Sequence, residues 1–187
     1  MQTADKVYAS IWRRIVAYLV DYVISFAVLI PLQYLFSVVT RGFPYSLFKT
    51  GLQIELWILL TVSLPVWLYF IFSEHSTHQA TFGKRLLRVR VTRVSGERMS
   101  FAQAILRTAI KLLPWELTHL SLMLPVPMWW DTTPNLRAGI VIAYVLVGVY
   151  LLVMLLNSRR QSVHDMIART VVVEAPKHEV LTSSVEV

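Results

Sequence analysis

Three segments of the chain are long and apolar enough to cross a lipid bilayer, and this feature constrains the fold more than any other. They cover residues 15–39, 52–72 and 138–156. The hydrocarbon core of a bilayer requires about 20 mostly apolar residues in a helix. The third segment has no charged residue, and the second has only Glu55, near its start. The chain is therefore predicted to be an all-α membrane protein, a polytopic bundle with at least three transmembrane helices.

The composition agrees with the membrane class. Of the 187 residues, 56% are apolar and only 16% are charged, which excludes a disordered or collagen-like chain. There is no cysteine, so disulfides and thiolate metal sites are excluded. The net charge is +7. In a membrane protein such an excess more often sets orientation and attracts anionic lipid than binds nucleic acid, so we expect membrane lipids as partners and no nucleic acid.

A fourth apolar segment, before the last span, carries charged side chains. Ser100 and Gln103 form a capping-box pattern, which predicts that a helix begins at Phe101. Gln103, Arg107 and Lys111 follow one another at intervals of four residues and share one narrow face. The first half of this segment is therefore predicted to be amphipathic and to lie at the membrane interface.

The second half of this segment decides the number of crossings. Pro114 is expected to end or kink the helix, and residues 112–130 are largely apolar. Basic residues are frequent before the first span, after the second and after the last, whereas only Arg41 and Lys49 separate the first two. Loops rich in Lys and Arg remain cytoplasmic. This pattern favours four crossings with both termini in the cytoplasm; three crossings, which would place the basic C-terminal segment outside, are the alternative.

Two short segments outside the spans have strand patterns. Residues 87–94 alternate apolar and polar side chains, and residues 170–173 form a β-branched run. Because an isolated strand needs a partner, the two are predicted to pair in a small cytoplasmic β element. We expect one membrane domain over residues 1–175 and a disordered polar cytoplasmic tail over residues 176–187.

Asp21 lies inside the first span, where a carboxylate is energetically expensive and normally faces protein, water or a partner charge. Arg14 precedes it by seven residues, which places both on one face, about 10 Å apart along the helix. Tyr18 and Ser25 extend this polar face. Two hypotheses follow. Either Asp21 binds a proton or cation and Arg14 tunes its pKa, or the face is a polar seam that fixes the first helix in the bundle.

His164 and Asp165 follow the last span and could suggest a metal or general-base site. One histidine and one aspartate supply too few ligands for zinc, so no metal site is expected. The alternative is that Asp165 pairs with nearby arginines, namely Arg159, Arg160 and Arg169.

Residues 74–78 superficially resemble a metalloprotease motif. The required H-E-x-x-H order is absent and the two histidines are three residues apart, so a solvated loop is expected there. A membrane hydrolase that uses His75, His78 or His164 is a third functional hypothesis. We expect no catalytic residue and no cofactor, and the protein is not expected to be an enzyme.

Further charged residues have simpler interpretations. Glu55 could bind an ion, although an interfacial carboxylate is the more ordinary expectation. Lys84, Arg85 and Arg88 belong to the basic loop after the second span. At a membrane surface, each is expected to contact anionic lipid headgroups.

Together these residues resemble the RDD family of bacterial membrane proteins, named for one arginine and two aspartates. The resemblance covers residues 10–173. Each similar segment is short, and the combination is more specific than any one of them. The similar segments are Arg13-Arg14 with Asp21, residues 80–87, residues 100–107 and residues 163–172.

The resemblance implies that Arg13 or Arg14 is the signature arginine, and that Asp21 and Asp165 are the two aspartates. The long insertion over residues 114–135 departs from the more compact pattern. Family membership implies a multi-pass protein of the bacterial inner membrane, and it suggests transport, including cation or proton exchange. The alternative is a non-catalytic membrane module that assembles with or stabilises a partner protein. A homo-oligomer or a membrane-protein partner fits either function.

Overall fold

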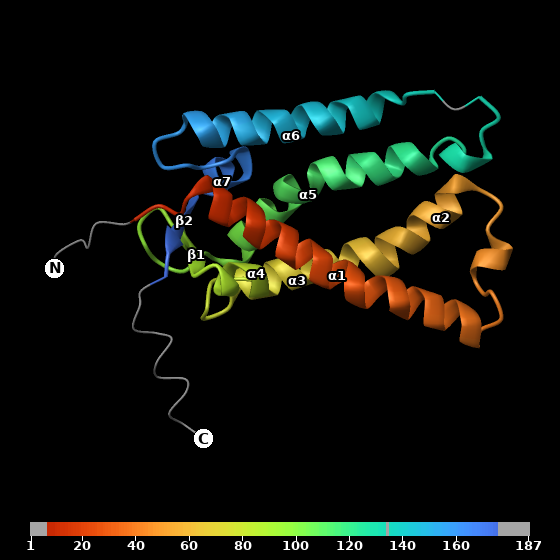
Figure 1. Ribbon diagram of the computed structural model, residues 1–187, viewed down its shortest axis with the longest axis horizontal. Helices are drawn as coiled ribbons and strands as arrows, with labels where there is room; N and C mark the ends of the chain where they lie inside the picture. The colour runs from red at the N-terminus through yellow and green to blue at the C-terminus, as the bar shows by residue number, and fades with distance from the viewer. Residues whose placement is uncertain (1–6, 134, 176–187) are drawn as a thin grey trace, which may run out of the picture.

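The computed structural model describes residues 7–133 and 135–175, and helices dominate it. Its elements are α1 (Ile11–Val39), η1 (Tyr45–Leu47), α2 (Gly51–Ile58), η2 (Leu59–Ser63), α3 (Leu64–His75), α4 (Phe82–Leu86), β1 (Val89–Arg93), α5 (Phe101–Met123), η3 (Met128–Trp130), α6 (Ala138–Leu156), α7 (Val163–Ile167) and β2 (Thr170–Glu174). The long helices run along the length of the molecule, and both strands lie at one end (Figure 1). We call this the sheet end and the opposite end the far end.

Within the described residues, three helical segments are long and apolar enough to cross a membrane, which confirms the three predicted spans. They are α1, the continuous helix Gly51–His75 and α6. The second combines α2 and α3 through η2, a π-helical turn. Many large apolar side chains on α1 and α6 are exposed, as expected for helices that face lipid. The fourth long helix, α5, packs along α6 and extends from the sheet end toward the far end (Figure 1).

The predicted β element is confirmed. β1 and β2 pair antiparallel, with Val91 opposite Val172. Tyr8 adds a bridge to Val173, so the segment before α1 and the last strand lie together at the sheet end. Valines of both strands pack against α3 and α5 through Ile71 and Ala104, forming a small apolar core. The predicted tail, residues 176–187, lies outside the described residues.

α5 begins as predicted, with Ser100 as its N-cap and Gln103 completing the capping box. Of the two alternatives for Pro114, the structure excludes an end, because the helix continues through this residue. One expectation for this segment needs correction. Its first half is not an interfacial amphipathic helix, because Arg107 is only 1% exposed and Lys111 only 8%. The polar face of α5 points into the protein, where carboxylates from α3 and α7 meet it.

Candidate functional site

Six charged side chains meet near the sheet end, and we call them the charge cluster. They are Arg14, Glu74, Lys84, Arg107, Lys111 and Asp165. They come from α1, α3, α4, α5 and α7, and all are buried. Removing an ion from water costs several kcal/mol unless partners replace its hydration. In the cluster, direct ion pairs replace this hydration, and together they link all five elements.

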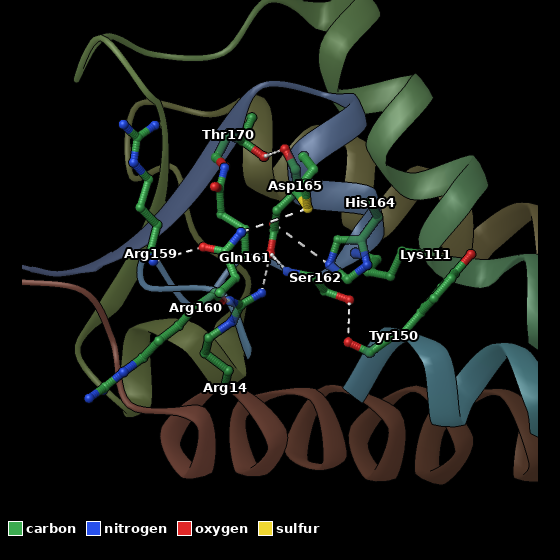
Figure 2. A network of polar contacts seen from close by, with 12 residues as sticks. Arg14, Lys111, Tyr150, Arg159, Arg160, Gln161, Ser162, His164, Asp165 and Thr170 are labelled. Carbon is green, nitrogen blue, oxygen red and sulfur yellow. Dashed lines mark hydrogen bonds and ion pairs between the residues drawn. The ribbon is translucent and has the colours of Figure 1, made fainter. Parts of the chain in front are cut away.

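Asp165 is held by two arginines. Arg14 Nη2 donates to Asp165 Oδ2, and Arg107 donates to Oδ1 from Nη2 at 2.7 Å and from Nε at 3.1 Å. The backbone N–H of Ser162 adds a bond of 3.1 Å. Figure 2 shows Arg14 reaching from α1 toward Asp165 on α7. Burial alone would raise the pKa of Asp165, but the two guanidinium groups hold it well below its ordinary value.

The arginine partners of Asp165 differ from the local pairing expected from the sequence. In the described part of the chain they are Arg14 and Arg107, which are distant in sequence, rather than the arginines near Asp165. Arg160 contributes its backbone carbonyl, which accepts a bond from Arg14 Nη1. Arg13 is partly exposed and pairs with Glu174 at 2.9 Å. The structure therefore places Arg14, and not Arg13, inside the protein.

Glu74 is the second acidic member of the charge cluster, although its sequence context predicted a solvated loop. Lys84 Nζ and Arg107 Nη1 donate to its carboxylate, and Lys111 Nζ donates at 3.1 Å. Arg107 thus bridges Glu74 and Asp165. The expectation of a solvated loop is wrong for Glu74, because α3 continues to His75 and Glu74 is completely buried, whereas residues 76–78 follow the helix in a turn. Three cations on other elements attract this carboxylate inward.

Lys84 does not lie on the surface of the basic loop. The sequence predicts contact with lipid headgroups at a membrane surface, whereas Lys84 is 7% exposed and pairs with Glu74. Burial lowers the pKa of Lys84, although the negative charge of Glu74 acts in the opposite direction. Arg85 and Arg88 are exposed and remain accessible to a membrane surface.

His164 adjoins the cluster but holds no metal ligand set. Its Nε2 lies 3.7 Å from Asp165 Oδ1, and its Nδ1 is buried without a hydrogen-bond partner among the described residues. Burial lowers the pKa of His164 to about 3, against the raising effect of Asp165, so the ring is neutral at physiological pH. Within the described ranges, no group of three or more His, Cys, Asp or Glu side chains could hold a metal ion.

The carboxylate of Asp21 accepts hydrogen bonds from uncharged donors, whereas Arg14 pairs with Asp165. Tyr69 Oη donates to Oδ1 at 2.7 Å, Thr81 Oγ1 donates to Oδ2 at 2.5 Å, and the Gly83 N–H donates to Oδ1 at 2.7 Å. The carboxylate, 1% exposed, thus joins α1 to α3 and α4. A Cβ at Gly83 would lie 2.2 Å from the carbonyl oxygen of Ala17, so only glycine allows this approach.

A second pair of carboxylates lies between α2 and α5, away from the charge cluster. Glu55 of α2 is 2% exposed, and its Oε2 is buried without a hydrogen-bond partner in the described part of the chain. Glu116 of α5 is close enough to interact with it electrostatically. Glu116 accepts bonds from Ser63 Oγ at 3.0 Å and Trp67 Nε1 at 2.8 Å. We call Glu55 and Glu116 the acid pair.

Close packing of α2 against the end of α5 positions the acid pair. A Cβ at Gly51 would lie 1.8 Å from the carbonyl oxygen of Met123. Glu55 lies one helical turn after Gly51 on α2. Glu116 lies two turns before Met123 on α5, and His119 lies between Glu116 and Met123. His119 Nδ1 is also buried without a partner among described residues. The sequence signalled Glu55 as a charge in an apolar span, but its partner lies on another helix.

These observations define a helical membrane protein with charged side chains buried among its helices. The sequence model of the RDD family matches residues 8–169, and the chain belongs to this family. A comparison with curated proteins found no significant match. A comparison with solved structures likewise found none.

Proposed function

We propose that this RDD-family protein is a non-enzymatic transporter that exchanges a monovalent cation for a proton at the acid pair. The observation that carries the proposal is Glu55, a carboxylate on a spanning helix that is 2% exposed and has no hydrogen-bond or ion-pair partner among described residues. Ionisable groups within membrane spans are expensive and mark ion or proton pathways.

The charge balance of the acid pair suits such an exchange. An unpaired buried carboxylate is strongly disfavoured, so Glu55 must carry a proton or bind a cation. With one of the two carboxyl groups protonated, the pair has one negative charge. When that proton leaves and a monovalent cation binds, the net charge of the site is unchanged. One-for-one exchange therefore buries no additional net charge.

The π-helical turn η2 supports a functional role at this position. It follows Glu55 by four residues and ends at Ser63, whose hydroxyl donates to Glu116. π-helical turns within α-helices are rare and occur frequently at functional sites. Here the wider turn presents Ser63 toward the acid pair while the helix continues into α3.

The sequence hypothesis placed the ion at Asp21 instead. Three donors already face the two oxygens of Asp21, one of them a backbone N–H that cannot become an acceptor. Both oxygens of Glu116 also accept hydrogen bonds, but Glu55 has no donor among described residues. A cation needs free oxygen acceptors around it, so Glu55 is available to an ion and Asp21 has a structural role. In the proposed mechanism, Asp21 and the charge cluster hold the helices in place, and the acid pair exchanges the ions.

The test is cation-driven proton movement in sealed proteoliposomes with a pH-sensitive dye inside. Under a sodium or potassium gradient, we expect a dye response from the wild type and none from Glu55→Gln. Glu97→Gln, which makes the same change at an exposed carboxylate, should retain the response. A wild-type protein without response to either gradient in tight vesicles would overturn the proposal. So would a response that persists in folded Glu55→Gln.

A non-catalytic membrane module that stabilises a partner protein is the second candidate. The complete pairing of Asp21 favours it, because the same residues could serve assembly alone. Under this function, Asp21→Asn would reduce recovery of a co-purifying membrane protein or of a homo-oligomer, while proteoliposomes would show no proton movement.

We further propose four crossings, with the sheet end and both termini in the cytoplasm of a bacterial cell. The 23-residue α5 supports this, since it runs beside α6 and returns the chain to the far end (Figure 1). The exposed Arg85 and Arg88 at the sheet end agree with the preference of basic residues for the cytoplasmic side. Four crossings place Trp130 outside the cytoplasm. A reporter enzyme that works only outside the cytoplasm should therefore be active when fused after Trp130, and one that works only in the cytoplasm should be inactive.

A further inference from the structure

A cavity of about 560 Å³ lies among α1, α5 and α6, apart from the acid pair. This volume is within the usual range for ligand pockets. Its walls are mostly apolar and include Leu19 of α1 and Val147 and Leu151 of α6. Leu19 and Tyr144, both on the wall, are highly exposed, so the rim reaches the lipid-facing surface of the helices.

The inner end of the cavity is cationic. All four basic members of the charge cluster line it: Arg14, Lys84, Arg107 and Lys111. Neither of their acidic partners, Glu74 and Asp165, is among the lining residues. The cluster has four basic and two acidic members, so with all of them ionised one positive charge remains in excess even when neighbouring Asp21 is counted. In this ionised form the lining presents unbalanced positive charge to whatever occupies the cavity.

Two lining side chains have unused hydrogen-bonding capacity. Among the described residues, Lys111 Nζ donates one hydrogen bond, to Glu74, and lies 3.4 Å from the centre of the Phe70 ring. An ammonium group has three donors. His164 Nδ1 is buried and has no partner in the described chain. Figure 2 shows Lys111 and His164 on the same side of the network, near Tyr150 of α6.

The position of the cavity along the helices matches the geometry of a membrane lipid. Its cationic end lies near the start of α1 and just beyond the end of α6, and the proposed crossings place these helix ends at the edge of the hydrocarbon. Its apolar walls follow the same helices into the membrane. An acidic headgroup would therefore lie at its ordinary depth, and an acyl chain would remain in an apolar environment.

We propose that the cavity binds an anionic phospholipid, with its phosphate at Lys111 and Arg14 and one acyl chain between α1 and α6. The lipid enters laterally from the leaflet at the sheet end. Its negative charge offsets the excess positive charge of the cluster. This site is separate from the acid pair and does not depend on cation or proton exchange.

Trp115 lines the cavity and provides the probe. The purified full-length protein in neutral detergent is titrated with phosphatidylglycerol or phosphatidylcholine brominated on the acyl chain, which quenches tryptophan. The contribution of Trp115 is obtained by difference from Trp115→Phe. We expect half-quenching of Trp115 at about tenfold lower concentration of phosphatidylglycerol, as charge-assisted hydrogen bonds would give.

Two pairs of variants locate the site. Lys111→Gln should remove the preference for phosphatidylglycerol, whereas Arg85→Gln, which removes an exposed cation, should retain it. Ala143→Leu fills the cavity from α6 and should abolish quenching of Trp115. Val145→Leu, on an exposed part of α6, should not. The Ala143 pair preserves the test if Lys111→Gln does not fold.

Several results would overturn the proposal. Equal quenching by the two lipids, or a preference that survives in Lys111→Gln, would exclude headgroup recognition at the cavity. Loss of lipid quenching on addition of inorganic phosphate would instead assign the site to a small anion. If quenching develops only after dilution has dissociated an oligomer into monomers, a second copy of this chain blocks the cavity, and the cavity would be assigned to that copy.

Discussion

The charge cluster and the acid pair bury charged groups in opposite ways. In the cluster, Glu74 and Asp165 each accept bonds from at least two cationic side chains. In the acid pair, Glu55 is equally buried but has no partner among described residues. A buried charge that is fully paired holds elements together. A buried charge without a partner destabilises the fold, so its presence suggests a role other than stability. The comparison separates residues that stabilise the bundle from residues available to an ion.

The largest effect on stability is expected in the charge cluster. Glu74→Gln leaves Lys84, Arg107 and Lys111 without their common carboxylate, and we expect it to lower the free energy of unfolding by about 3 to 5 kcal/mol. Equilibrium unfolding in mixed micelles measures the change. Glu97→Gln is the exposed control and should be nearly neutral. A small effect at Glu74 would show that the cluster is not structural.

A matched pair of glycines tests whether close approach of the helices at Asp21 matters. Gly83→Ala places a methyl group against the Ala17 carbonyl and the Asp21 carboxylate, and should cost about 1 to 3 kcal/mol of unfolding free energy. Gly148→Ala meets no atom within 4 Å and should be neutral or slightly stabilising. The same unfolding measurement compares the two. Equal effects would mean that α4 does not need this contact with α1.

Acid should weaken the cluster through His164. Its pKa is about 3 in the folded protein and 6.5 when unperturbed, so the unfolded chain binds a proton first as pH falls. Stability from this group is complete above pH 6.5 and declines between 6.5 and 3, by at most about 1.4 kcal/mol per pH unit. His164→Gln should flatten the decline measured between pH 7 and 5. An unchanged slope would show that His164 does not titrate on unfolding.

The smallest effect on stability is expected in the acid pair. Glu55→Gln removes no hydrogen bond among described residues and relieves the cost of a buried carboxylate, so unfolding free energy should change by less than about 1 kcal/mol, or increase. Thermal unfolding of the variant beside the wild type provides the measurement. Loss of several kcal/mol would place Glu55 in the same structural category as Glu74.

Local patterns in the sequence predicted several of the elements correctly. The three spans follow from apolar length, the start of α5 from Ser100 and Gln103, and the β pairing from two short runs. These signals depend on residues close together in the chain. They do not depend on which helices become neighbours.

The candidate sites depended on contacts that no local pattern contains. Arg14 and Asp165 are 151 positions apart, and Arg107 and Glu74 are 33 apart. A row of basic residues on one helix is ordinarily interfacial, so Arg107 and Lys111 were assigned to the surface. Carboxylates from α3 and α7 reverse that expectation. Asp21 was recognised as important from its cost alone, but its three donors lie on other elements and could not be identified.

The pairing of Arg14 with Asp165 also orders events during biosynthesis. Arg14 belongs to the first long helix and Asp165 to the last short one, so the ribosome makes the arginine long before its partner. Until α7 emerges, the guanidinium of Arg14 has to be satisfied by water or lipid phosphate. The N-terminal helix can therefore form this contact only after Asp165 has been translated, and truncation before Asp165 would leave Arg14 without its carboxylate.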